Sequence, residues 1–179
     1  MKKLKRIYTA FLSASHKTHL LSIAGFAALL VIGAFVFEHG FGAAPCHLCW
    51  LARYGHWAIL AAALGGMLLP EKARFGALAV VLLGAVYGLG LGIYHSLVQA
   101  KVIPGPSGCS GAPDFPADMA SFQKFLENPT LPPRCDEVNF YLFGLSLPVW
   151  NIITMAFLMW IVYIVFMKRQ KSRQKSKGE

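Results

Sequence analysis

Charged residues are scarce in this chain of 179 residues. They make up 14% of it, whereas an average soluble domain holds roughly 25%. Hydrophobic residues make up 56%, and a chain with so much apolar side chain cannot stay solvated as a disordered segment. The composition therefore favours a membrane protein over a soluble domain.

The scarcity of charge is greatest in four long stretches, which we predict to be transmembrane helices. A helix needs about 20 mostly apolar residues to cross the hydrocarbon core of a bilayer. The predicted spans are residues 20–37, 50–69, 75–97 and 148–167. Between and around them we expect a basic N-terminus at 1–19, a loop at 38–49, a turn at 70–74, a long loop at 98–147 and a basic tail at 168–179. The predicted fold class is an all-α membrane protein, a four-transmembrane-helix bundle that forms a single membrane domain over 1–179.

Positive charge is nearly absent from one side of this predicted topology. Thirteen of the 17 Lys and Arg residues fall in the N-terminus, the short turn and the tail, which share one side of a four-span protein. Loop 38–49 holds none of them, and the long loop holds three. Since Lys and Arg accumulate in cytoplasmic loops, both termini are predicted to be cytoplasmic and both loops periplasmic. Charge placed in flanks around an apolar body also argues against nucleic-acid binding.

A stripe of small residues runs along the third predicted span. Gly84, Gly88 and Gly92 recur every four residues and so share one helical face. Small residues allow helices to approach closely within lipid. We therefore predict that this face packs against a neighbouring helix.

The apolar spans lack cysteine altogether, and all four cysteines map to the predicted periplasmic side. Cys46 and Cys49 form a C-x-x-C at the start of the second span, and Cys109 and Cys135 lie in the long loop. An even number of cysteines on an exported face favours disulfides. For the loop pair, a structural bridge and an exchanging bridge stay equally open. So short a ring as C-x-x-C is typical of redox exchange.

A zinc site is the weaker interpretation of these cysteines. His39 and His47 lie near the C-x-x-C and could complete a ligand set. Such a site would need reduced ligands on an oxidising face, and the chain has no second C-x-x-C. We therefore predict no metal.

An arginine and two histidines lie close to the C-x-x-C in the predicted helices. The second helix is predicted to begin around Cys49, whose thiol then meets the positive end of the helix dipole, and Arg53 follows on the same face one turn deeper. Both features predict a lowered pKa for Cys49. A charged side chain is costly inside a membrane, which favours a functional site over a simple anchor at Arg53. His56 is interpreted as a packed side chain, and His95 is a secondary candidate that could reach the same pocket.

Taken together, these elements resemble the DsbB-type disulfide bond formation proteins of bacterial inner membranes. The resemblance covers nearly the whole chain. It depends on the sequence of residues 45–49, Pro-Cys-His-Leu-Cys, at the second of four spans, on Arg53 four residues later, and on the Cys109 and Cys135 loop. The sequence of residues 143–150, Phe-Gly-Leu-Ser-Leu-Pro-Val-Trp, enters the fourth span.

The resemblance implies a membrane oxidoreductase that reoxidises a DsbA-like periplasmic thioredoxin-fold protein and passes electrons to the membrane quinone pool, as ubiquinone or menaquinone. Cys109 would accept attack from the reduced partner, and Cys135 would then attack Cys46 and open a Cys46–Cys49 bridge. Cys49 would be left as a thiolate against the quinone. The resemblance also implies that Arg53 stabilises this thiolate and polarises the quinone ring, with His95 placed near the quinone.

Two other functions stay open at this point. The first is a non-catalytic membrane scaffold or subunit whose cysteines form structural disulfides. The second is an enzyme similar to vitamin K epoxide reductase, which is disfavoured because the C-x-x-C there opens a later helix. A transporter is discouraged because the spans lack polar residues at mid-depth.

Overall fold

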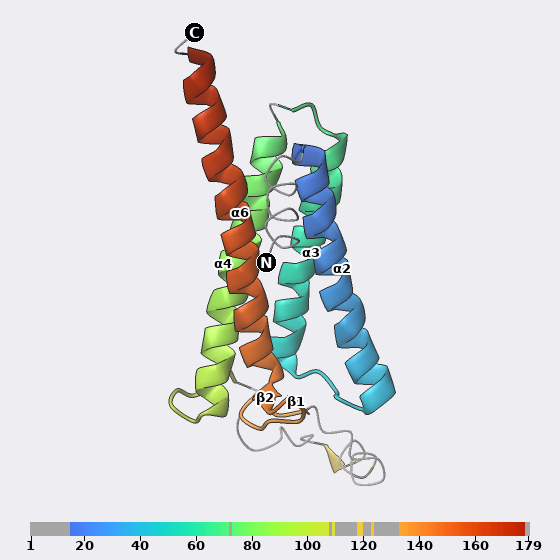
Figure 1. The fold of residues 1–179 in the computed structure, drawn as a ribbon. Helices are drawn as coiled ribbons and strands as arrows, with labels where there is room; N and C mark the ends of the chain where they lie inside the picture. The colour runs from blue at the N-terminus through green and yellow to red at the C-terminus, as the bar shows by residue number, and fades with distance from the viewer. Residues whose placement is uncertain are drawn as a thin grey trace.

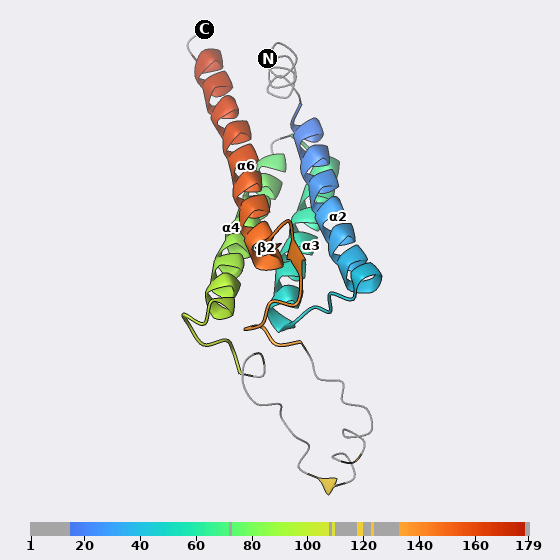
Figure 2. The same ribbon diagram turned by 60° about the horizontal axis from the view of Figure 1, so that its bottom comes forward.

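The computed structural model describes residues 15–71, 73–107, 109, 118–119, 123 and 133–177, with the backbone alone described for 168–177. Four helices, α2 (His16–Phe41), α3 (His47–Leu68), α4 (Arg74–Gln99) and α6 (Leu147–Lys177), lie side by side as a bundle (Figure 1). The start of α2 and the end of α6 lie at one end of this bundle, and a short hairpin lies at the other (Figures 1 and 2). Residues 1–14 of the basic N-terminus, Lys72, and residues 108, 110–117, 120–122 and 124–132 of the long loop lie outside the described residues.

The helix ends follow from local sequence. Ser15 caps α2, because its hydroxyl accepts a hydrogen bond from the backbone N–H of Thr18 at 3.3 Å. The same helix ends at Gly42, whose φ of 68° is a left-handed conformation that glycine adopts without steric cost. At α6, Pro148 occupies the first turn, where its missing N–H leaves no hydrogen bond unmade.

Three of the described helices are long and apolar enough to cross a membrane: α2, α4 and residues Leu147–Met167 of α6. Helix α3 does not reach the same hydropathy, since Arg53 and His56 lie in its first half. Large apolar side chains project from the outer faces of the bundle, and Leu29 of α2 and Leu83 of α4 are each 69% exposed. Apolar outer faces of this extent suit a lipid environment. The chain is an all-helical membrane protein, and the predicted membrane boundaries within its helices stay a prediction.

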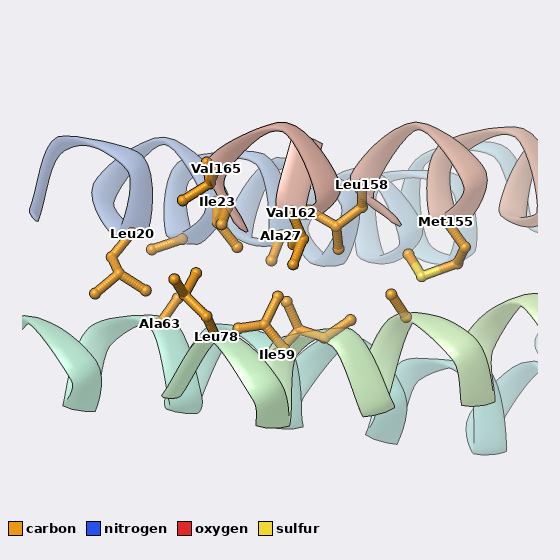
Figure 3. Close-up of a cluster of buried hydrophobic side chains, with 13 residues drawn as sticks. Leu20, Ile23, Ala27, Ile59, Ala63, Leu78, Met155, Leu158, Val162 and Val165 are labelled. Carbon is orange, nitrogen blue, oxygen red and sulfur yellow. The ribbon is translucent and has the colours of Figure 1, made fainter. Parts of the chain in front are cut away.

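The helices pack in the order α2, α3, α4, α6, with few contacts between α2 and α6. Figure 3 shows side chains from all four helices pointing toward one another in the core. The core residues include Leu20 and Ile23 from α2, Ile59 and Ala63 from α3, Leu78 and Val81 from α4, and Met155, Leu158, Val162 and Val165 from α6. The sparse contact between α2 and α6 leaves a seam between these two helices.

The glycine stripe of α4 lies at helix contacts, which confirms the packing prediction. A Cβ at Gly84 would come 2.7 Å from Ile59 Cγ1 of α3. A Cβ at Gly88 would come 2.9 Å from Met155 Sδ of α6. The stripe therefore serves two neighbours rather than one.

The entry into α6 contains a hairpin that the sequence analysis did not predict. Strands β1 (Tyr141–Leu142) and β2 (Leu145–Ser146) are antiparallel, with Leu142 opposite Leu145. The two residues of the turn, Phe143 and Gly144, have φ of 50° and 79°, as a tight hairpin turn requires. Trp150 Nε1 donates to the Leu142 carbonyl at 2.9 Å and so fastens the hairpin to α6.

Candidate functional site

The C-x-x-C lies where the chain turns into α3. Cys46 is the residue that precedes the helix, and Cys49 lies in its first turn. Both are free thiols, with their Sγ atoms 3.3 Å apart. Cys46 is buried, whereas Cys49 is partly exposed. The structure therefore holds this pair in the dithiol state, at a separation from which a disulfide can form with a small movement.

The loop cysteines lie beside this pair. Cys109 and Cys135 are joined by a disulfide, and both are buried. The Sγ atoms of Cys46, Cys109 and Cys135 all lie within 4.8 Å of one another. They share a buried cluster with Leu48 of α3 and Val98 of α4. The fold thus brings together two cysteine pairs that are 60 or more positions apart along the chain.

His95 contacts the C-x-x-C directly. It comes from the last turns of α4, is 4% exposed, and holds its Nε2 3.7 Å from Cys46 Sγ. The hydrogen bond with Cys49, supported by His95, lowers the pKa of Cys46 to about 4, although burial opposes this shift. His95, a secondary candidate from the sequence, therefore contacts the cysteine pair through Cys46.

The prediction that Cys49 has the lowered pKa is wrong for this dithiol. The shared hydrogen bond with Cys46 and burial both raise the pKa of Cys49, which precedes the predicted span. Arg53 acts on Cys49 only as a weak opposing influence. Only one of two adjacent thiols ionises readily, because a second negative charge beside the first would be repelled. The thiol that faces a histidine is the one favoured, because the histidine stabilises its negative charge.

Arg53 is buried and is bound by α2 rather than by a cysteine. Its Nη1 donates to the Glu38 carboxylate in an ion pair, and its Nη2 donates to the Ala34 carbonyl at 3.2 Å. The guanidinium also lies over two aromatic rings, 4.9 Å from the centroid of Phe35 and 4.8 Å from that of Trp50. These contacts explain how a charged side chain stays inside the bundle. A guanidinium has five N–H donors, so these two bonds leave others for a ligand.

Glu38 was not predicted to belong to the site. A signal was present, because Glu38 is the sole carboxylate among residues 1–70 and precedes a predicted span that contains a lone arginine. Opposite charges at matching depth on neighbouring helices attract strongly where water is scarce. The pairing could not be deduced without knowing that α2 and α3 turn these faces toward each other.

A cavity of about 370 Å³ opens in the seam between α2 and α6, next to these residues. Cys49, Arg53, His56 and His95 line it from α3 and α4. Apolar side chains from all four helices make up most of the remaining wall, among them Leu30, Phe37, Leu91 and Pro148. A largely apolar cleft of this size with a few polar groups is typical of a small-molecule site.

Among the described residues, Cys46, Cys49 and His95 offer three possible metal-ligand atoms within 4.8 Å of one another. A structural zinc takes four protein ligands, and a catalytic zinc takes three and a water. His39, one of the histidines considered for zinc, bonds the Phe35 carbonyl through its Nδ1 at 3.1 Å. The absence of a metal from this site stays a prediction.

Apolar helices that hold a C-x-x-C against a loop disulfide, beside an apolar cavity, define the class of membrane thiol–disulfide oxidoreductases. Residues 16–165 match the family described as "Disulfide bond formation protein DsbB". This match spans most of the chain, and the chain belongs to the DsbB family of membrane disulfide bond formation proteins.

Individual relatives agree with this assignment. The chain is 32% identical over 170 residues to "Disulfide bond formation protein B" of Actinobacillus pleuropneumoniae serotype 5b, a match that covers 90% of this chain and 93% of the relative. It is 31% identical to the protein of the same name from Pasteurella multocida, covering 83% and 86% of the two chains. It is 30% identical to that of Aeromonas hydrophila, covering 85% and 88%.

Proposed function

We propose that this protein reoxidises a DsbA-like periplasmic thioredoxin-fold protein and passes the electrons through its two cysteine pairs to a quinone of the membrane, either ubiquinone or menaquinone. The observation that carries the proposal is the line of sulfur atoms from the loop disulfide to the cavity. Cys109, Cys135 and Cys46 lie within 4.8 Å of one another, and Cys49 lies 3.3 Å further on and lines the cavity.

The first exchange takes place between the partner and the loop disulfide. A partner thiolate attacks Cys109, which forms a mixed disulfide and releases Cys135 as a thiolate. Cys135 attacks Cys46 of an oxidised C-x-x-C, forms a Cys46–Cys135 bond and releases Cys49. The second partner thiol then displaces Cys109 and leaves the partner oxidised. Since Cys109 is buried, the loop has to expose it before the partner can react.

The second exchange restores the loop disulfide and leaves the C-x-x-C reduced. Cys109 attacks Cys135, so that the loop bridge re-forms and Cys46 and Cys49 are left as the dithiol. This dithiol gives up two electrons and two protons when it returns to a disulfide. A quinone supplies the sink, because the same two electrons and two protons convert it to a hydroquinone. The net reaction oxidises one partner dithiol and reduces one quinone.

The cavity residues have separate parts in this proposal. Arg53, held by Glu38, would donate its remaining N–H groups to an oxygen of a bound quinone and favour negative charge there. His95 stabilises the thiolate of Cys46. The wall of apolar side chains holds the ring and excludes water.

We further propose a bacterial inner-membrane location with α2, α3, α4 and α6 all spanning the bilayer. Both termini would face the cytoplasm, and the four cysteines would face the periplasm. Helix α3 has 22 residues, about 33 Å at 1.5 Å per residue, which is long enough to span despite its polar first half.

The test is quinone reduction by the purified protein. The detergent-solubilised protein is mixed with a reduced thioredoxin-fold oxidase and a short-tailed benzoquinone, and quinone absorbance is followed. We expect turnover with the native chain and none with Cys49→Ser, which lacks the thiol facing the cavity. The same variant should still form a mixed disulfide with the partner, because Cys109 and Cys135 are intact.

Two outcomes would contradict the proposal. Full turnover by Cys49→Ser would show that electrons bypass the C-x-x-C. Bridges that stay inert to the dithiol partner in the native chain would support a scaffold with structural disulfides instead.

A further inference from the structure

The cavity contains a histidine that neither thiol exchange nor the arginine site requires. His56 lies on α3 seven residues after Cys49, two turns further along the same face, and it lines the cavity. Its side chain was expected to be a packed one. The structure shows how the two ring nitrogens differ.

One ring nitrogen of His56 is fixed by the backbone. Nδ1 lies 2.7 Å from the carbonyl oxygen of Ala52, one turn earlier in α3. Because a carbonyl can only accept, Nδ1 carries the hydrogen and donates it. A neutral imidazole has a single N–H, so Nε2 is left with its lone pair as an acceptor. Among the described residues, no hydrogen bond to Nε2 accompanies this one.

Two other polar side chains line this part of the cavity wall, and each donates a hydrogen bond to a backbone carbonyl. Thr154 of α6 donates its hydroxyl to the Trp150 carbonyl at 2.9 Å. Asn151 donates its Nδ2 to the Gly88 carbonyl at 2.8 Å, and its Oδ1 is buried away from the cavity space without a hydrogen-bond partner among the described residues. His56 lines the cavity and uses only Nδ1 in the hydrogen bonds of the described residues. The deep end of the cavity therefore offers an acceptor, whereas Arg53 offers donors nearer the cysteines.

We propose that His56 binds a hydroxyl group of the hydroquinone through Nε2, and thereby makes the cavity prefer the reduced ring over the oxidised one. A quinone has two carbonyl acceptors, whereas a hydroquinone has two O–H donors, so a lone-pair nitrogen can bond the reduced form alone. His56 lies about 10.5 Å of helical rise from Cys49 and about 4.5 Å from Arg53, so the three side chains line the same cavity at different depths. This inference rests on the quinone reaction proposed above.

The experiment compares two constants in the purified protein, using a short-tailed benzoquinone and its hydroquinone. These are the KM for the quinone and the product-inhibition constant of the hydroquinone. In His56→Phe, which keeps a ring but loses both nitrogens, we expect the inhibition constant to rise about fivefold while the KM changes less than twofold. His56→Gln, whose amide oxygen can accept, should return the inhibition constant to within about twofold of the native value.

Thr154→Val is the matched control, because it changes the same wall where the hydroxyl is already bonded to backbone. It should leave the ratio of the two constants unchanged. Constants that move in step in His56→Phe, or a Gln variant that behaves like the Phe variant, would overturn the role of His56 while leaving quinone reduction standing. No quinone reduction by the native chain would overturn both proposals.

A ligand comparison in the native protein covers the case in which a His56 variant does not fold. The hydroquinone and its dimethyl ether, which has no O–H donor, are compared as inhibitors. The hydroquinone should inhibit at least about fivefold more tightly. Equal inhibition by the two compounds would refute the proposed hydrogen bond.

Discussion

Removing the carboxylate of Glu38 should strand the positive charge of Arg53 inside the bundle. The guanidinium side chain is 8% exposed and the carboxylate side chain 21% exposed. Breaking a fully buried ion pair from one side costs about 3–5 kcal/mol, because the remaining charge has lost its partner. The carboxylate here keeps some contact with solvent, so the expected loss for Glu38→Gln is smaller, about 2 kcal/mol. That loss corresponds to a roughly 30-fold change in the unfolding equilibrium.

A double-mutant cycle isolates this pair. The native chain, Glu38→Gln, Arg53→Met and the double variant are unfolded in mixed micelles with a denaturing detergent, and helicity is followed by circular dichroism. The double variant should be more stable than Glu38→Gln alone, because it no longer buries an unpaired cation. Glu71→Gln is the control, since Glu71 lies in the exposed turn between α3 and α4, and it should change the free energy of unfolding by less than about 0.5 kcal/mol.

The coupling free energy between Glu38 and Arg53 tests whether the carboxylate stabilises the buried guanidinium. A coupling free energy below about 0.5 kcal/mol would mean that Arg53 does not depend on Glu38. A double variant less stable than both single variants would refute the idea of a stranded charge. Either result would also remove the basis for treating Glu38 as the residue that positions Arg53.

Two further predictions concern the thiol pair and the helix packing. In the reduced protein, the pKa of about 4 for Cys46 predicts alkylation at a rate that stays nearly constant from about pH 6 to pH 8, whereas an ordinary thiol loses rate steeply below about pH 8.5. His95→Ala should move the midpoint of this profile upward, and an unchanged midpoint would contradict the role of the histidine. Gly66→Ala should destabilise the bundle by about 1–3 kcal/mol, because its Cβ would lie 2.5 Å from the Cβ of Ala77. Gly90→Ala meets open space and is the control, so equal stability of the two variants would contradict this packing.

The pH dependence of stability follows from the same thiol. The folded reduced state holds Cys46 as a thiolate down to about pH 4, whereas the unfolded chain protonates it below about pH 8.5. The stabilisation from this group is therefore complete above the unfolded pKa, declines as the pH falls through the interval, and is lost below the folded pKa.

The sequence by itself determined the helical membrane character of the chain, the placement of the cysteines outside the long apolar spans, and the close approach of α4 to its neighbours through Gly84 and Gly88. These properties depend on the composition of a segment and on the spacing of residues along one helix. Both can be read along the chain, because the rise and period of a helix are fixed.

The tertiary structure alone decided which faces meet. It paired Arg53 with Glu38 instead of with Cys49, and it placed His95 against Cys46. It also left an acceptor nitrogen of His56 in a cavity between α2 and α6, and it folded residues 141–146 into a hairpin. The contacts of Arg53, His95 and His56 depend on how one helix is rotated against another, and that rotation is set by side-chain packing across the whole bundle rather than by the period within any one helix.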